Sequence, residues 1–240
     1  MKIVDCIWEQ ANLGCRVAEI AVDPIETIQH ETLDELEEKY DYIVLKCPVS
    51  CFQHYEIAQK KQYTFIEAQI SVQKKWKDWI FNPQDARTAK NFYAVEITST
   101  TELEEILNKI DESMYTTDRI CLDPAFGPAF SANRYRNWTR SAFEQGAILQ
   151  KYFFRDKEIG YGVAKLENQI LHGLIGGIYS KSGIGLGFIV PIGVRFIKNH
   201  SIEWFKTKIS ANNAPVLRLY NHFNFEITDV EYVFIKHIKH

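Results

Sequence analysis

The sequence predicts a mixed α/β (α+β) protein, with a small α/β domain over residues 1–88 and a larger domain over residues 89–240. Three observations predict this fold class. Strand-like and helix-like stretches alternate in the first third of the chain. A polar stretch without clear period then interrupts the pattern. Beyond it, three successive strands joined by short turns indicate an antiparallel meander, so we expect a central mixed, mostly antiparallel sheet.

The composition is that of an ordinary globular protein, with 46% hydrophobic and 25% charged residues. A formal net charge of -3 argues against nucleic-acid binding, which draws on clustered Lys and Arg. The apolar run Gly183–Val194 contains glycines and a proline and is shorter than the roughly 20 residues that cross a bilayer. Asp5 and Glu9 stand where a signal peptide would be apolar. We therefore expect a cytoplasmic protein that binds neither nucleic acid nor membrane.

Five cysteines at irregular spacing predict reduced, mostly buried thiols rather than disulfides. Cys47, Cys51 and His54 have a C-x3-C-x2-H spacing that could supply three metal ligands. A structural zinc site needs four ligands, and no fourth lies nearby in the sequence. We expect these side chains to serve in packing, with no metal bound.

The first third of the chain is predicted to be β-α-β-α-β. Asp23-Pro24 precedes the first helix, whose outer face is acidic, and Ser50 can cap the second helix. In chain order the five elements are the strand Arg16–Val22, the helix Ile25–Tyr40, the strand Tyr42–Leu45, a helix ending near Lys61, and the strand Tyr63–Val72.

The polar stretch that opens at Lys74 contains the breaker Asn82-Pro83, so we place the domain junction near residue 88. From Phe92 the pattern restarts with a strand to Ile97. Ser99-Thr100-Thr101-Glu102 is a capping signal, and it predicts a helix through Ile110.

A loop rich in Pro and Gly, Asp123–Pro128, precedes a predicted helix over Asn133–Gln145. Long loops of this kind often line functional sites. The meander follows. Its three strands are Ile148–Phe154, Ile159–Leu166 and Gln169–Tyr179.

A glycine-rich loop follows the last meander strand and leads directly into an apolar segment of helical length. Backbone N–H groups can close around an anion where side chains are absent, and a helix start adds unpaired donors. The loop is neither a P-loop nor a Rossmann fingerprint. The candidate phosphate-binding residues are Lys181, Ser182, Gly183, Ile184, Gly185 and Gly187.

A second motif follows the strand-like Ile202–Ile209. Asn213 is a good N-cap, Pro215 belongs in a first helical turn, and Asn224 can take the left-handed conformation that ends a helix. The sequence therefore predicts a helix over this segment, which carries Tyr220, and then a final strand from Phe225.

The part of the chain from roughly Phe92 to His240 resembles the GNAT acetyltransferase superfamily. The resemblance rests on the order of its elements, which is a meander, a glycine loop, a helix, a strand and then the motif N-x-x-A/V-x-x-L-Y-x-x-x-G/N-F. This resemblance implies an acetyl-CoA-dependent N-acetyltransferase whose two central strands splay apart. It also implies that the glycine-loop amides bind the CoA pyrophosphate, that Asn213 contacts CoA, and that Tyr220 protonates the departing thiolate. The chain departs from the family where Ser180 or Ser182 replaces the usual Gln or Arg, and where Pro191 falls inside a helix.

The segment Trp8–Gly14 resembles the first domain of the dTDP-fucosamine acetyltransferases, which are two-domain GNAT enzymes. That resemblance implies that residues 1–88 form an incomplete GNAT-like domain on the acceptor side. The segment Arg134–Trp138 also resembles the aromatic segment that borders the sugar-nucleotide site in these enzymes. Together the two resemblances imply a nucleotide-linked (dTDP) 4-amino-4,6-dideoxyhexose as acceptor, with Arg134 and Tyr135 contacting it; surface packing is the alternative role of these two side chains. A peptide, a protein N-terminus or a small polyamine is the alternative acceptor, and a non-catalytic acyl-CoA-binding module is the alternative function.

Amide formation needs a base, an oxyanion donor and an acid. A phenol with a pKa near 10 is matched to protonating a thiolate, which suits Tyr220. We expect a backbone N–H on the strand Ile159–Leu166 to meet the oxyanion. His172 and Glu167 are the candidate bases, and the sequence does not decide between them. Exposed strand edges could also pair two chains into a homodimer.

Overall fold

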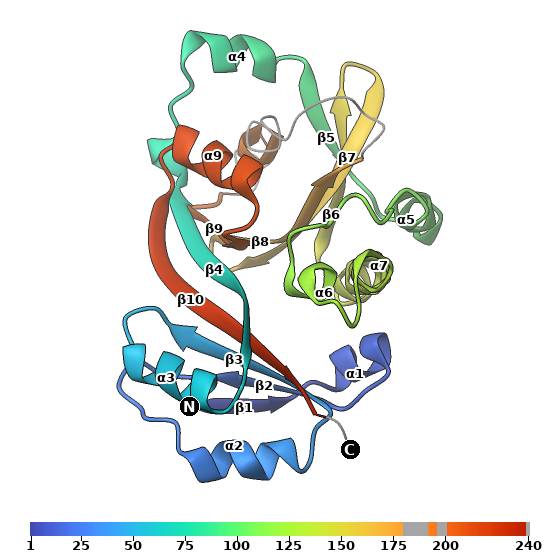
Figure 1. The fold of residues 1–240 in the computed structure, drawn as a ribbon. Coiled ribbons are helices and arrows are strands. Elements are labelled where there is room, and N and C mark those ends of the chain that lie inside the picture. The colour runs from blue at the N-terminus through green and yellow to red at the C-terminus, as the bar shows by residue number, and fades with distance from the viewer. Residues whose placement is uncertain (180–191, 196–200, 239–240) are drawn as a thin grey trace.

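The structure is a computed structural model and describes residues 1–179, 192–195 and 201–238 (Figure 1). One ten-stranded sheet runs through both predicted domains in the order β1-β2-β3-β10-β4-β9-β8-β7-β6-β5. Among the strand pairs of the described residues, β2–β3 and β8–β9 are parallel and the others are antiparallel, so the predicted mixed, mostly antiparallel sheet is confirmed. In the described part of the chain, every helix is too short or too polar to cross a membrane.

The strands are β1 (Lys2–Asp5), β2 (Val17–Ala21), β3 (Tyr42–Pro48), β4 (Thr64–Lys75), β5 (Phe92–Glu96), β6 (Ile148–Phe154), β7 (Lys157–Glu167), β8 (Ile170–Ile178), β9 (Trp204–Ser210) and β10 (Glu226–His237). The helices are α1 (Ile7–Leu13), α2 (His30–Glu37), α3 (Phe52–Lys60), the 3-10 turn η1 (Trp76–Asp78), α4 (Pro83–Ala89), α5 (Thr100–Leu107), α6 (Arg119–Leu122), α7 (Pro128–Glu144) and α9 (Ala214–His222).

The sheet is completed by a strand from early in the chain. β4 lies between β9 and β10 and is antiparallel to both. Figure 1 shows β4 and β10 as two long strands that connect the lower and upper parts of the molecule. The predicted junction near residue 88 lies inside α4. The division into two domains therefore stays a prediction, while the sheet itself is continuous across it.

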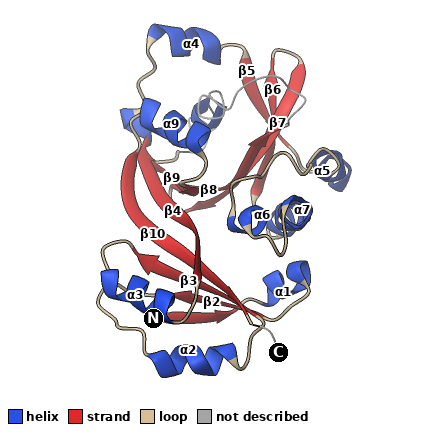
Figure 2. Cartoon of the chain, in the orientation of Figure 1, coloured by secondary structure: helices blue, strands red, loops and turns tan. Residues whose placement is uncertain are grey.

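Helices cover the sheet on both faces (Figure 2). On one face α5 and α7 bury an apolar cluster that includes Ile106, Tyr161, Val163 and Ile175. On the opposite face Tyr152 packs in a separate cluster with residues of β5 and β7 and with Ile192, from the helical residues 192–195. The two faces of β6–β8 are therefore both buried, as strands in the middle of a sheet between helices require.

Several predicted elements are confirmed by local chemistry. The meander β6–β7–β8 is antiparallel, as its turns indicated. The Ser99 hydroxyl accepts from the Glu102 backbone N–H at 3.3 Å and donates to the Glu102 carboxylate at 2.8 Å. The backbone N–H of Ser99 also interacts with that carboxylate, as in a capping box. Asn224 ends α9 at φ 51°, in the left-handed region.

Other elements differ from the prediction. Helix α7 begins at Pro128, five residues earlier than predicted, because Gly127 at φ 79° precedes a proline in the first turn. Helix α2 begins at His30 rather than Ile25. Ser50 does not cap α3, whose N-cap is Cys51 without a side-chain hydrogen bond. The short elements β1, α1, α4 and α6 were not predicted.

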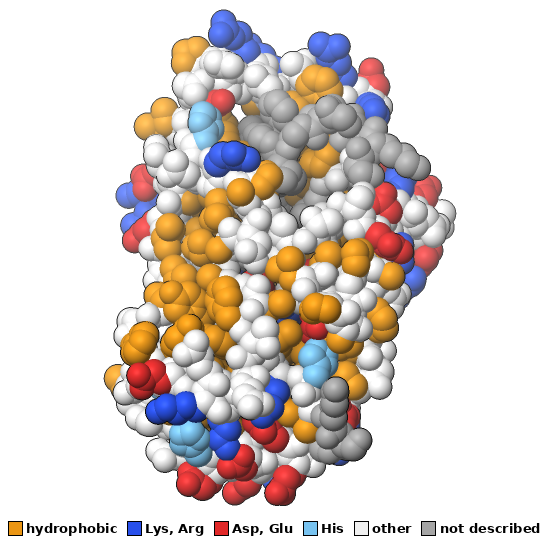
Figure 3. All heavy atoms as spheres, in the orientation of Figure 1, with side chains coloured by type: hydrophobic (Ala, Val, Ile, Leu, Met, Phe, Trp, Pro, Cys, Tyr) orange, Lys and Arg blue, Asp and Glu red, His pale blue; other side chains and the backbone are white. Residues whose placement is uncertain are grey.

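The edges of the sheet are β1 and β5. Apolar side chains also gather over β4 and β10 on the face drawn in Figure 3. Phe65 of β4 and Ile227 of β10 are among the exposed large hydrophobic residues. The predicted homodimer would use one of these surfaces, and it stays a prediction.

Candidate functional site

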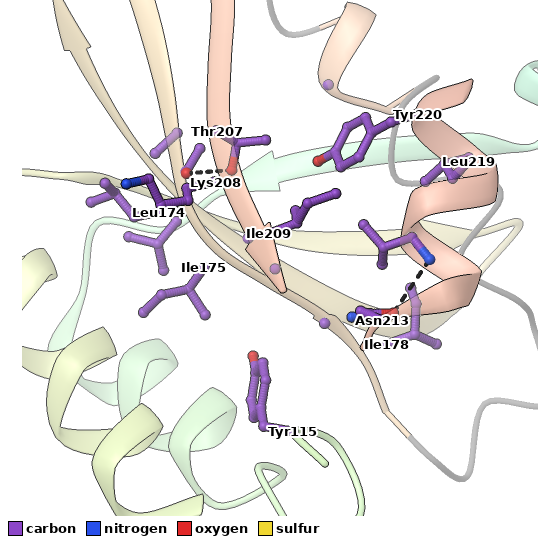
Figure 4. A pocket seen from close by; sticks show the side chains of 18 of the residues that line it. Tyr115, Leu174, Ile175, Ile178, Thr207, Lys208, Ile209, Asn213, Leu219 and Tyr220 are labelled. Atoms are coloured by element: carbon purple, nitrogen blue, oxygen red, sulfur yellow. Dashed lines mark hydrogen bonds between the residues drawn. The ribbon is translucent and has the colours of Figure 1, made fainter. Parts of the chain in front are cut away.

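The central feature of the sheet is a fork between β8 and β9. The two parallel strands pair from Ile170 and Trp204 as far as Gly173 and Thr207. Their pairing ends there, although β8 continues to Ile178 and β9 to Ser210. At the last pair the Thr207 hydroxyl donates to the Gly173 carbonyl at 2.8 Å (Figure 4). This bond fixes the point at which the strands separate.

The fork has two local causes in β8. Val163 pairs with Ile175 and Ala164 with Gly173, so Leu174 is an extra residue in the β8 ladder. Such a bulge bends the strand and increases its twist. Gly173 is the second cause, because a Cβ at this position would lie 2.8 Å from the Phe205 ring. A side chain here would press the two strands apart before the fork.

A cavity of about 310 Å³ occupies the fork. It is lined from both faces of the sheet. Tyr115, Tyr135 and Ile175 line it on the α7 face, and Tyr152 and Tyr220 line it on the α9 face. Figure 4 shows Tyr115 and Tyr220 on opposite sides of the separated strands. The cavity therefore passes through the sheet and can admit two molecules from opposite faces.

Helix α9 brings two predicted site residues to this cavity. Asn213 is the N-cap, and its side-chain oxygen accepts from the Val216 N–H at 3.3 Å. Tyr220 lies seven residues on, about two turns along the same helix face. Both residues line the cavity (Figure 4). The structure thus brings the two side chains to one cavity, and their roles towards CoA stay predictions.

The Tyr220 ring packs edge-on against Phe225, with centroids 4.5 Å apart. Burial raises the pKa of Tyr220 above that of an ordinary phenol, and the nearby Tyr152 adds to the effect. The group is therefore held protonated at neutral pH. A protonated phenol facing a cavity is what a general acid requires.

Tyr152 is a site residue that the sequence reasoning missed. It lies on β6, and its hydroxyl sits against Gly162 of β7, where a Cβ would collide with it. Both residues line the cavity. The alternation Gly160-Tyr161-Gly162 in the middle of a strand is the signal that could have found it, because a strand glycine often marks a close approach by another group.

The α7 side of the cavity is aromatic. Tyr135, one of the two predicted substrate residues, stacks on Tyr115 with ring centroids 3.6 Å apart. The Tyr115 hydroxyl donates to the Tyr161 hydroxyl at 2.7 Å. Burial raises the pKa of Tyr115 and Tyr135, so both remain neutral phenols. This wall offers flat rings and hydroxyls rather than charge.

Arg134, the other predicted substrate residue, does not line the cavity. Its guanidinium donates to the Glu9 carboxylate at 2.7 and 2.9 Å and lies over the Trp8 and Trp138 rings. Burial opposes ionisation of Glu9, but Arg119 and Arg134 lower its pKa below the ordinary value. Arg134 instead lines a second hollow of about 390 Å³, together with Trp8 and Trp138.

The remaining predicted site residues are not brought to the cavity. Lys181, Ser182, Gly183, Ile184, Gly185 and Gly187 lie outside the described residues. His172 lies on the paired part of β8, before the fork. Glu167 is exposed and pairs with Lys165 at 2.6 Å, and that hydrogen bond lowers the Glu167 pKa. Neither candidate base lines the cavity.

The predicted oxyanion donor also needs correction. β7 pairs with β6 on one side and with β8 on the other, so its backbone groups are used in two ladders. Beyond Gly173, in contrast, β8 has no ladder partner in β9. A backbone donor that faces the cavity therefore belongs to β8 rather than to β7.

The C-x3-C-x2-H side chains are used in local contacts. His54 Nε2 lies 2.6 Å from the Glu26 carbonyl, and the Cys51 thiol donates to the Pro24 carbonyl at 3.2 Å. Burial raises the pKa of Cys47 to about 12, so its thiol stays protonated. These contacts support the packing role expected from the sequence.

Comparison with solved structures identifies the fold. A GCN5-related N-acetyltransferase from Kribbella flavida superposes with a TM-score of 0.56 at 11% identity, covering 92% of this chain and 81% of its own. A tandem GNAT protein from the clavulanic acid biosynthesis pathway gives 0.54 at 12% identity, covering 93% and 76%. The chain has the GNAT fold.

Another GNAT-fold match extends beyond this chain. The GCN5-related N-acetyltransferase from Sphaerobacter thermophilus superposes with a TM-score of 0.56 at 10% identity, and this chain spans 60% of its length. At these identities the likeness shows the fold alone. No family model and no curated protein sequence matches the chain.

Proposed function

We propose that this GNAT-fold protein is an acetyl-CoA-dependent N-acetyltransferase. The observation that carries the proposal is the cavity through the sheet at the fork, with Tyr220 on its α9 side. Transfer between two substrates requires that they meet with little bulk water, and a passage between splayed strands provides that arrangement.

In the proposed reaction a neutral primary amine attacks the thioester carbonyl carbon. Backbone N–H groups of β8 beyond Gly173 meet the negative charge that develops on the carbonyl oxygen. The C–N bond forms, the C–S bond breaks, and the Tyr220 hydroxyl gives its proton to the departing thiolate. The loop Lys181–Gly187 and Asn213 hold CoA in this proposal, as the family resemblance implies.

We propose a nucleotide-linked (dTDP) 4-amino-4,6-dideoxyhexose as the acceptor. The second hollow supports this choice, because it combines the flat rings of Trp8 and Trp138 with two cations, Arg134 and Lys165, that are paired with Glu9 and Glu167. Flat rings suit a nucleobase, and a diphosphate would have to compete with these carboxylates for the two cations. Leu174 lines both the hollow and the fork cavity, so the two adjoin.

The test begins with calorimetric titration of acetyl-CoA, for which we expect one site per chain. An acetylation screen follows with dTDP-4-amino-4,6-dideoxygalactose, a tetrapeptide with a free N-terminus, and spermidine. We expect turnover with the sugar nucleotide. Turnover with the peptide or spermidine alone would keep the enzyme and change its acceptor. Tight CoA binding without any acetylation would instead favour a non-catalytic module, and absence of CoA binding would contradict the proposal.

A further inference from the structure

The α7 side of the fork cavity ends in a buried acidic group that the reaction outlined above does not use. Asp118 and Ser210 line this end of the cavity. Glu67 of β4, which is 2% exposed, lies beside the Ser210 side chain, whose hydroxyl accepts from the Asn212 N–H at 3.3 Å. Gln69, directly across the ladder from Ser210, donates to the Glu67 carboxylate at 3.0 Å.

Asp118 keeps one carboxylate oxygen without a partner. Its Oδ1 accepts from the Cys121 N–H at 3.1 Å and from the Ser131 hydroxyl at 2.9 Å. Its Oδ2 is buried and makes no hydrogen bond within the described part of the chain. A buried carboxylate oxygen without a donor is costly, unless a ligand supplies one.

The charged side chains around this end of the cavity carry one more negative charge than positive charges. Three carboxylates lie in this region: Glu9, Glu67 and Asp118. Two guanidiniums face them, Arg119 and Arg134, and both of these are hydrogen bonded to Glu9. The one lysine among the described cavity residues, Lys208, forms an ion pair with Glu231. Glu19 and Lys46, which also act on this network, pair with each other at 2.8 Å. One negative charge among these groups is therefore left over, which a substrate ammonium would balance.

We infer that this acidic end, formed by Asp118, Ser210 and Glu67, receives the acceptor amine as its ammonium and removes its proton. The inference rests on the proposed acetyltransfer. Asp118 Oδ2 accepts a hydrogen bond from the ammonium. The Ser210 hydroxyl takes a proton from the ammonium nitrogen as it passes its own to the Glu67 carboxylate. The neutral amine then attacks the thioester, and the second nitrogen proton lost on forming the amide restores the Tyr220 phenol. Glu67 passes its proton back through Ser210 to solvent before the next turnover.

The groups around Glu67 set the pH range of this step. Arg119 of α6, its N-cap Asp118 and Tyr135 of α7 act on it, Gln69 donates a hydrogen bond to it, and the Ser210 side chain lies beside it. Burial is the main effect and raises the Glu67 pKa, Asp118 raises it further, and Arg119 and the hydrogen bonds lower it. A carboxylate with a raised pKa is a stronger base towards an ammonium.

The experiment compares Glu67→Gln and Asp118→Asn with the unaltered protein, using the three amines of the acceptor screen. Asn preserves the α6 cap, since it retains the oxygen that the Cys121 N–H needs. We expect Glu67→Gln to lower kcat about 100-fold or more and to abolish the rise of kcat with pH, because a lost base typically costs 10² to 10⁴. We expect Asp118→Asn to weaken amine binding to the CoA complex about tenfold and to move the rise to lower pH.

Acetyl-CoA affinity should stay within about twofold in both variants, because neither residue lies on the α9 side. Glu37→Gln is the matched control, since Glu37 is a partly buried carboxylate paired with Lys236, away from the cavity. It should leave kcat and the pH profile unchanged. Thermal unfolding confirms that each variant folds. Normal stability with a wild-type pH profile for Glu67→Gln would overturn this inference and leave the acetyltransferase proposal standing. No amine binding to the unaltered CoA complex would overturn both.

Discussion

At the scale of single residues, the proton-donating phenols and the proton-accepting carboxylates of the fork cavity lie in different parts of it. Neutral phenols line it from both faces, since burial raises the pKa of Tyr115, Tyr152 and Tyr220. Ionisable carboxyl groups are confined to one end, at Asp118 and behind Ser210. A site arranged in this way can hold a proton donor and a proton acceptor at neutral pH without one neutralising the other.

The role of Tyr220 as proton donor is tested by Tyr220→Phe, which removes the hydroxyl and keeps the ring contact with Phe225. We expect kcat to fall about 10²- to 10³-fold, because the thiolate loses its acid, with acetyl-CoA affinity near normal. Steady-state kinetics and calorimetric titration measure the two effects. Tyr63→Phe is the control, since Tyr63 is also a buried tyrosine and lies far from the cavity. Equal turnover of the two variants would remove Tyr220 from the mechanism.

At the scale of elements, the sequence predicted what local chemistry decides. The capping box at Ser99, the Asn213 cap and the three meander strands each depend on neighbours close in sequence, and all are confirmed. The short helix α6 has no periodicity to detect, and the Asn82 cap of α4 was interpreted as a breaker. Local signals fail for helices of one or two turns, because tertiary packing stabilises them.

The residues of the candidate site follow the same rule: those close in sequence could be predicted together, and those from distant segments could not. Asn213 and Tyr220 belong to one helix, so a single motif predicted both. The family resemblance implied that two central strands splay apart, but the position of the fork could not be predicted, because the bulge at Leu174 depends on the register between β7 and β8. Asp118, Ser210 and Glu67 come from three distant segments, and only the sheet order brings them together. Arg134 does not reach the cavity, because its guanidinium is held by the buried Glu9 carboxylate, 125 residues away in the sequence.

Thr207→Val tests whether the Thr207 hydroxyl holds the fork in place, because it removes the hydroxyl and keeps the side-chain shape. Loss of its bond to the Gly173 carbonyl should lower the free energy of unfolding by about 1 kcal/mol. We also expect acetyl-CoA to bind several-fold more weakly, because the strands lose a fixed point of separation. Thr88→Val removes a comparable hydroxyl-to-carbonyl bond on the exposed helix α4. If both variants bind acetyl-CoA equally well, the bond has no part in shaping the cavity.

At the scale of the whole molecule, the first third of the chain completes the fold of the remainder. β4 supplies the strand between β9 and β10, with ladders to both. Glu9 of α1 accepts from Arg119 of α6 and Arg134 of α7 in a buried network. Residues 1–88 therefore contribute a central strand and a buried counter-ion to the part of the sheet that carries the cavity.

These contacts predict the behaviour of a divided chain. Residues 89–240 alone would leave β9 and β10 with unpaired edges and leave Arg119 buried without a carboxylate, so we expect this fragment to aggregate or to unfold without cooperativity. Expressed together with residues 1–88, it should form a soluble complex that binds acetyl-CoA. Size-exclusion chromatography and thermal unfolding measure both results. A fragment 89–240 that is soluble and unfolds cooperatively by itself would show that the C-terminal part folds independently, and that β4 only extends a sheet already complete.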